Sequence, residues 1–135
     1  MSVQNATLLV GGTVSATGGT STAFVPNGAQ VNSGVQVVDS TDSNSVTRAS
    51  ITCQNVKIPA IDPKTGKYPG KIRRRGTVTR PKVLSDGRVV FQLARVEVEY
   101  HPEATDAEVT ALLSQGAQLL CDSDFTSFWK VGSLA

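Results

Sequence analysis

The sequence predicts an α+β domain in which antiparallel strands come first and two helices come last. Polar and apolar residues alternate with period two through much of residues 46–100, as they do in half-buried strands. From residue 105 onward the apolar residues recur at helical spacing instead. Because every predicted strand precedes both helices, the helices are expected on one face of an antiparallel sheet.

Length and composition favour one small domain over residues 1–135. Aromatic residues make up only 5% of the 135 residues, so we expect a modest aliphatic core to which a partner chain could contribute. No Lys or Arg precedes Arg48, and no apolar run approaches the ~20 residues of a membrane helix, so a soluble protein without a targeting segment is expected. Cys53 and Cys121 fit no metal spacing and are predicted to be buried free thiols.

Residues 1–34 are predicted to form an N-terminal β-hairpin. They carry no charged side chain, and two apolar runs, Leu8-Leu9-Val10 and Ala23-Phe24-Val25, are separated by two pairs of glycines. A disordered tail is the alternative, but such tails usually carry a high net charge. The sheet is expected over residues 35–101, starting with a strand at residues 35–38 that ends in a polar turn.

Two longer strands follow, and the second of them is basic. Residues 46–58 alternate, with uncharged polar side chains on one face. Pro and Gly residues mark a loop over residues 59–70, after which the alternation resumes. One face of the strand at residues 71–79 then carries Lys71, Arg73, Arg75, Thr77 and Thr79. Arg74 interrupts the opposite, apolar face, and it is expected to reach an edge or a partner.

The last strand leads into two helices over residues 105–132. Residues 85–87 mark a turn, and residues 88–100 alternate again, with a polar face that mixes Arg95 with acids. Thr105-Asp106-Ala107-Glu108 has the spacing of a capping box and predicts the start of the first helix. Asp122 or Ser123 can cap a second, short helix that ends at Gly132.

Residues that usually carry catalysis are sparse. The single histidine, His101, precedes a proline at the end of a strand and is predicted to lie on the surface, and no Ser or Cys has a context that pairs it with a base. The acids Glu97, Glu99 and Glu103 have no ligand histidine nearby and are expected to face solvent or a basic neighbour. No catalytic residue, metal site, cofactor or small-molecule substrate is therefore predicted.

Charge is sorted by segment, and this points to nucleic acid. Ten of the thirteen Lys and Arg residues lie in residues 57–88, although the net charge is only +2. Side chains two apart on a strand stand roughly 7 Å apart, close to the spacing of nucleic-acid phosphates. The alternative is a solvated edge strand whose cations oppose aggregation. The neighbouring uncharged face of Ser50, Thr52 and Gln54 favours RNA, because such groups can contact base edges.

Together these elements resemble the coat proteins of single-stranded RNA bacteriophages, the levivirus type, over essentially the whole chain. The resemblance rests on the uncharged N-terminal segment and on Ala49-Ser50-Ile51-Thr52-Cys53-Gln54, Lys71-Ile72-Arg73-Arg74-Arg75, Val96-Glu97-Val98-Glu99-Tyr100 and Thr105-Asp106-Ala107-Glu108, in this order. It implies an N-terminal β-hairpin, an antiparallel five-stranded sheet, and two C-terminal helices that pack across the sheet of a dimer partner.

The same resemblance implies a non-enzymatic shell subunit. Such a subunit dimerises, assembles into an icosahedral shell in the cytoplasm of the bacterial host, and binds single-stranded genomic RNA. It can also bind an operator hairpin and so repress replicase translation. Compared with the family, the turn at residues 85–87 is short and the loop at residues 59–70 is long, so the segment that lines the symmetry axes stays open.

Site residues follow from the resemblance position by position. The positions that match the family's RNA-facing residues are Thr52, Gln54, Lys71, Arg73, Arg75, Thr77, Arg95 and Glu97. The positions expected to cover the partner's sheet are Val109, Leu112, Leu113, Leu120, Phe125, Phe128 and Trp129.

Two other functions stay open. A dimeric RNA-binding regulator would use the same basic strand without assembling, and an enzyme domain would use the acidic C-terminal half. The size of the particle in solution separates a shell from a dimer.

Overall fold

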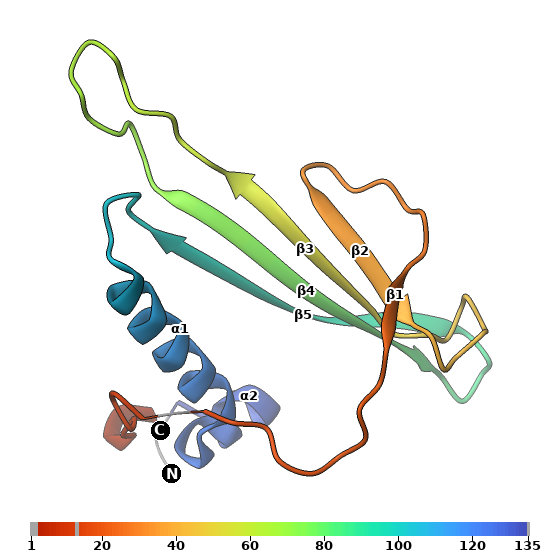
Figure 1. The fold of residues 1–135 in the computed structure, drawn as a ribbon. Helices are drawn as coiled ribbons and strands as arrows, with labels where there is room; N and C mark the ends of the chain where they lie inside the picture. Colours follow the sequence, from red (N-terminus) through yellow and green to blue (C-terminus); the bar gives the residue numbers. More distant parts are fainter. Residues whose placement is uncertain (1–2, 13, 135) are drawn as a thin grey trace. The chain divides into compact units, whose positions relative to one another are not determined.

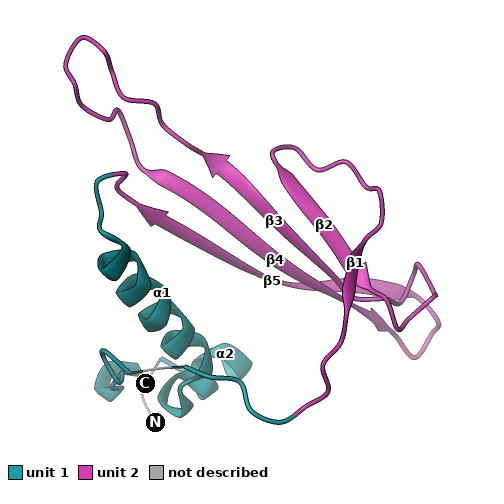
Figure 2. Cartoon of the chain, in the orientation of Figure 1, with its two compact units in different colours: residues 1–18, 103–135 teal, residues 19–102 magenta. Residues whose placement is uncertain are grey.

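The computed structural model describes residues 3–12 and 14–134, and the chain divides into two compact units (Figure 2). Residues 19–102 form the sheet unit. Residues 1–18 and 103–135 form the helix unit, which brings together the two ends of the chain. Residues 1–2, 13 and 135 lie outside the described part, although the predicted hairpin and domain include them. The grouping of both units into one domain stays a prediction.

The sheet unit is a five-stranded antiparallel sheet in which every strand pairs with its neighbour in sequence (Figure 1). Its strands are β1 (Phe24–Pro26), β2 (Gly34–Asp39), β3 (Ser50–Lys57), β4 (Ile72–Val83) and β5 (Val89–Tyr100). The predicted five-stranded antiparallel sheet followed by two helices is confirmed. Strand β5 ends the strand order, so within the described chain its twelve residues are paired only with β4.

Strand β3 begins four residues later than predicted because a turn precedes it. The side-chain oxygen of Asn44 accepts a hydrogen bond from the N–H of Val46 at 2.9 Å. The carbonyl of Asn44 accepts another from the N–H of Arg48 at 3.1 Å. Asn favours such local turns over a strand, so the pairing starts only at Ser50.

Strand β4 runs past its predicted end at residue 79 to Val83, although it contains Pro81. Beyond Thr79, β4 pairs with β5 but no longer with β3. This stretch is therefore an edge of the sheet, where the missing N–H of a proline is tolerated.

The predicted N-terminal hairpin is wrong in its pairing. Residues 8–10 form no strand, whereas the second run contains β1, which pairs with β2. The first run belongs to the helix unit instead. There the N–H and hydroxyl of Thr7 donate to Oδ2 of Asp124 at 3.0 and 3.2 Å. These contacts join residues far apart in the sequence and tie the segment before the first run to the C-terminal part of the chain.

The helix unit carries both predicted helices. Its elements are η1 (Val3–Asn5), α1 (Asp106–Cys121), η2 (Ser123–Phe125) and α2 (Thr126–Val131). Thr105 caps α1 as predicted, because its side chain accepts a hydrogen bond from the N–H of Glu108 at 3.2 Å. Asp122 caps η2, and Gly132 ends α2 with a left-handed φ of 72°. No helix in the described part is long and apolar enough to cross a membrane.

The single chain has almost no core. Among the described residues Val38 is the only buried hydrophobic side chain, at 5% exposure, and Gln118 is the only buried polar one. The expected burial of the thiols is wrong for the chain by itself, since Cys53 and Cys121 are both exposed. The modest core expected within one chain is therefore absent from the described residues, which favours the alternative that a partner supplies it.

Candidate nucleic-acid interface and partner surface

One face of the sheet gathers most of the side chains predicted to meet RNA. The register places Thr52 opposite Thr77, and Thr77 opposite Arg95. Paired residues of antiparallel strands point to the same face. We call this surface the polar face, and it is formed by Gln36, Thr52, Gln54, Arg73, Arg75, Thr77, Arg95, Glu97 and Glu99. Of the predicted RNA-facing residues, only Lys71 lies outside a strand, one residue before β4.

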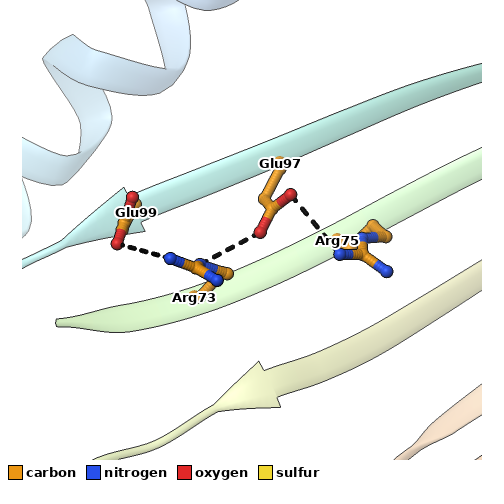
Figure 3. A network of polar contacts seen from close by, with 4 residues as sticks. All are labelled: Arg73, Arg75, Glu97 and Glu99. Atoms are coloured by element: carbon orange, nitrogen blue, oxygen red, sulfur yellow. Dashed lines mark hydrogen bonds and ion pairs between the residues drawn. The ribbon is translucent and has the colours of Figure 1, made fainter.

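Ion pairs link the two arginines of the polar face to two glutamates of β5 (Figure 3). Arg73 Nε lies 3.0 Å from Glu97 Oε1, and Arg73 Nη2 lies 3.0 Å from Glu99 Oε1. Arg75 Nη2 lies 3.5 Å from Glu97 Oε2, so Glu97 contacts both arginines. The expectation that Glu97 and Glu99 face a basic neighbour is confirmed.

These pairs set the electrostatics of the polar face. The hydrogen bond to Glu99, with the attraction of Glu99 and Glu97, holds the pKa of Arg73 above its usual value. Arg75 Nε is buried and finds no hydrogen-bond acceptor in the described chain. The four side chains are 30–45% exposed, so water screens the pairs. A ligand anion in solution can therefore reach the same guanidinium groups.

The polar face continues onto β2 at a residue that the sequence analysis missed. Gln36 Nε2 donates to the hydroxyl of Thr52 at 3.4 Å, and Asn27 Nδ2 donates to Gln36 Oε1 at 3.2 Å. A hollow of about 160 Å³ lies beside them and is lined by Asn27, Gln36, Val38, Ser45, Arg48, Ser50, Thr79, Pro81 and Phe91. The alternation in residues 35–38 was the signal that could have placed Gln36 on this face.

The opposite face of the sheet is apolar and open. It contains a depression of about 510 Å³, lined mainly by Val35, Cys53, Asn55, Arg74, Gly76, Val96 and Val98. Val35 is 58% exposed and Val96 is 43% exposed. We call this surface the apolar face. Nothing in the described chain fills the space above Gly76, where an added Cβ would meet no atom within 4 Å.

Arg74 lies on the apolar face and contacts both neighbouring strands, including the edge strand β5, while its predicted contact with a partner chain stays a prediction. Its Nε donates to Asn55 Oδ1 at 3.0 Å, and its Nη1 donates to the hydroxyl of Tyr100. The guanidinium carbon also lies 5.6 Å from the centre of the Tyr100 ring. Polar groups of the neighbouring strands therefore hold this cation on the face itself.

The predicted partner-facing side chains lie in the helix unit and are not buried there. Leu112, Leu113, Leu120 and Trp129 are 42–50% exposed. Val109, Phe125 and Phe128 are half-buried. Trp129 Nε1 donates to the carbonyl of Leu119 at 2.8 Å, and its ring centre lies 4.9 Å from that of Phe128. The two aromatic rings thus form a rigid, partly open apolar surface.

The single histidine lies at the surface of the sheet unit. His101 is exposed, and its ring contacts that of Tyr68 edge-on, with 6.0 Å between the ring centres. In residues 3–12 and 14–134, no group of three or more His, Cys, Asp and Glu side chains is placed to hold a metal ion.

Comparison with known proteins identifies the fold. No protein-family model and no curated protein sequence matches the chain. A solved chain from the virus-like particle of bacteriophage GQ-907 is 33% identical, with a TM-score of 0.89, and the alignment covers 99% of this chain and 100% of that one. Chains from the virus-like particles of bacteriophages AVE019 and ESE058 share the fold at 13% and 17% identity. Their TM-scores are 0.63 and 0.62, with 82% and 83% of this chain covered and 83% and 86% of theirs.

The likeness to the GQ-907 chain defines the class of protein as a structural subunit of a viral capsid, located in the shell of the virion. At 33% identity over nearly the whole chain, it belongs to the coat proteins of single-stranded RNA bacteriophages, the levivirus type.

Proposed function

We propose that two copies of this chain form a dimer, that dimers assemble in the host cytoplasm into a closed icosahedral shell, and that the polar face binds single-stranded RNA inside it. The main support for a dimer is that the described part of the single chain has almost no hydrophobic core. Burial of apolar surface is the main favourable term in folding, so a chain whose described residues bury only one hydrophobic side chain needs another surface to cover the rest.

Two features of the chain support a dimer of this kind. The long open edge of β5 exposes a row of unpaired backbone groups, and a second β5 can pair with it. The two units also differ in charge. The sheet unit has twelve Lys and Arg against six Asp and Glu, a net charge of +6, whereas the helix unit has one against five, a net charge of −4. The helix unit of one copy is thus complementary in charge to the sheet unit of another.

Three properties of the polar face support RNA binding. It combines guanidinium groups, which match phosphate geometry, with uncharged groups on Thr52, Gln54 and Gln36 that can contact base edges. The hollow beside Gln36 is lined by further amide and hydroxyl groups, and its size suits a small chemical group of a ligand. In this proposal an RNA hairpin on the polar face also represses replicase translation, and replacement of Thr52 or Gln54 changes which hairpin is preferred.

Expression of the full chain alone in bacteria tests the proposal. Closed particles seen by electron microscopy, containing nuclease-protected host RNA, are the expected result. A species of dimer size that binds RNA would instead favour the non-assembling regulator. Sedimentation that finds only dimers at low salt with RNA present would refute the shell, and particles without RNA would refute RNA packaging.

A further inference from the structure

The arginines of the polar face already have partners before any RNA arrives. Glu97 contacts both Arg73 and Arg75, and Glu99 contacts Arg73 a second time (Figure 3). The β4–β5 register places Arg73 opposite Glu99 and Arg75 opposite Glu97, so the sheet itself holds these pairs together. Two positive charges of the polar face are therefore balanced by two negative charges.

The cations without such partners lie around this network. Within the described residues no ion pair includes Lys57, Lys71 or Arg95. Lys57 pairs with Arg73 in the β3–β4 register, and Arg95 lies opposite Thr77. A phosphate group can meet these cations directly, whereas at Arg73 and Arg75 it must first displace a carboxylate. Displacement is feasible because the carboxylates are 35% and 45% exposed and not locked in a buried site.

We propose that Glu97 and Glu99 are specificity-determining residues of the polar face, which lower its affinity for any RNA backbone by occupying Arg73 and Arg75. The proposal rests on RNA binding by this face. A backbone that offers only phosphates gains little from arginines that already hold carboxylates. An RNA that also satisfies the uncharged groups around Thr52 and Gln54 gains the additional contacts that favour displacement. The glutamates therefore penalise sequence-independent binding more than specific binding.

Charge-neutral, nearly isosteric replacement tests this role. The full-length variant Glu97→Gln/Glu99→Gln keeps hydrogen-bonding groups beside the arginines but removes both negative charges. The probe is an oligouridine of about 10 nucleotides, a length suited to one binding face, and binding is measured over a series of salt concentrations. The variant should bind the oligouridine more tightly, and the slope of log K against log salt should steepen by about 1.4, because two more phosphates are contacted at roughly 0.7 each.

The expected gain is largest at low salt. A slope difference of 1.4 makes the ratio of variant to wild-type affinity fall about sevenfold between about 50 and 200 mM salt. Glu97→Gln alone should give more of the effect than Glu99→Gln alone, because Glu97 contacts both arginines. Thermal unfolding of each variant checks that the sheet is intact. If the double variant is unfolded, the two single variants test the proposal instead, because the gain in affinity should be larger for Glu97→Gln than for Glu99→Gln.

The matched control is Asp42→Asn/Asp62→Asn, which removes the same charge from loops of the sheet unit, outside the polar face. An unchanged affinity in this control is expected. An equal gain in affinity in the control would show a general charge effect and overturn the proposal. If the wild type binds RNA but the Glu97→Gln/Glu99→Gln variant has the same salt slope, the proposal is also overturned. Failure of the wild type and the variant to bind RNA at any salt concentration would instead refute the proposed RNA-binding function itself.

Discussion

Replacement of Gly76 by Val distinguishes a chain that works alone from one whose apolar face is covered by a second copy. Gly76 lies inside β4 on the apolar face, outside the left-handed region of backbone space, and an added Cβ meets nothing within 4 Å. In an isolated chain the new Cβ therefore meets no obstacle, and the change is expected to stabilise the strand by about 0.5–1 kcal/mol because Gly is a poor strand residue.

The sign reverses if a partner packs into the depression above Gly76. Overpacking a filled site costs about 1–3 kcal/mol, and a symmetric dimer contains the site twice. A loss of roughly 2–6 kcal/mol per dimer raises the dissociation constant by about thirtyfold or more. Sedimentation over a dilution series measures this constant, and electron microscopy counts the particles.

Thr79→Val is the control, because it places the same side chain on β4 but on the opposite face. It should leave the dimer unchanged. A Gly76→Val protein that forms particles at the wild-type concentration and unfolds at a higher temperature would refute the view that a second copy fills the apolar face.

The other predictions concern the helices, the arginines and a turn. Leu113→Ala should cost roughly 2–5 kcal/mol of stability if the proposed dimer buries this half-exposed leucine, so soluble dimer and shell should be lost together. The thermal unfolding midpoint of the wild type should rise with protein concentration. A midpoint independent of concentration would contradict burial by a partner. Arg73→Ala/Arg75→Ala should weaken binding to the preferred RNA and flatten its salt dependence, with a smaller effect on oligouridine, because only an RNA that displaces Glu97 and Glu99 contacts these arginines. Normal packaging with an unchanged slope would show that these arginines meet no phosphate. The hydroxyl and N–H of Thr41 donate to the Asp39 carboxylate at 2.6 and 2.8 Å, and they lower the pKa of Asp39. The ionised carboxylate therefore stabilises this turn at pH values above the usual pKa of Asp. This stabilisation is lost as the pH falls through the lowered pKa of Asp39. The stability advantage of the wild type over Asp39→Asn, read from thermal unfolding, should be present near neutral pH and vanish in strong acid, and an advantage independent of pH would contradict this role.

The strands and helices of the second half were predictable because their signals are local. Alternation located β5 and most of β4, and the Thr105 capping box located the start of α1 to the residue. The first half was less predictable. The pairing of β1 depends on whether the run at residues 8–10 or strand β2 accepts it, and Thr7, next to that run, contacts Asp124, which is 117 positions away.

The polar face was predictable as a set of residues but not as an electrostatic surface. Period-two alternation places Arg73 and Arg75 on one face whatever the neighbouring strand is. Their contacts with Glu97 and Glu99 depend on the β4–β5 register, which the sequence does not specify to the residue. The exposure of Cys53 has a similar origin, since burial predicted from residue type assumes that one chain closes its own core.

The two units of the chain complete at different times during synthesis. The sheet is a series of hairpins between neighbouring strands, so each strand can pair as soon as the next one has left the ribosome. The helix unit is closed by Thr7 and Asp124, which are 117 positions apart, and this contact must wait until the last residues have been translated. A chain released early therefore has the strands of the sheet but lacks the contact that closes the helix unit. In the proposed dimer and shell, only completed chains can therefore contribute a closed helix unit.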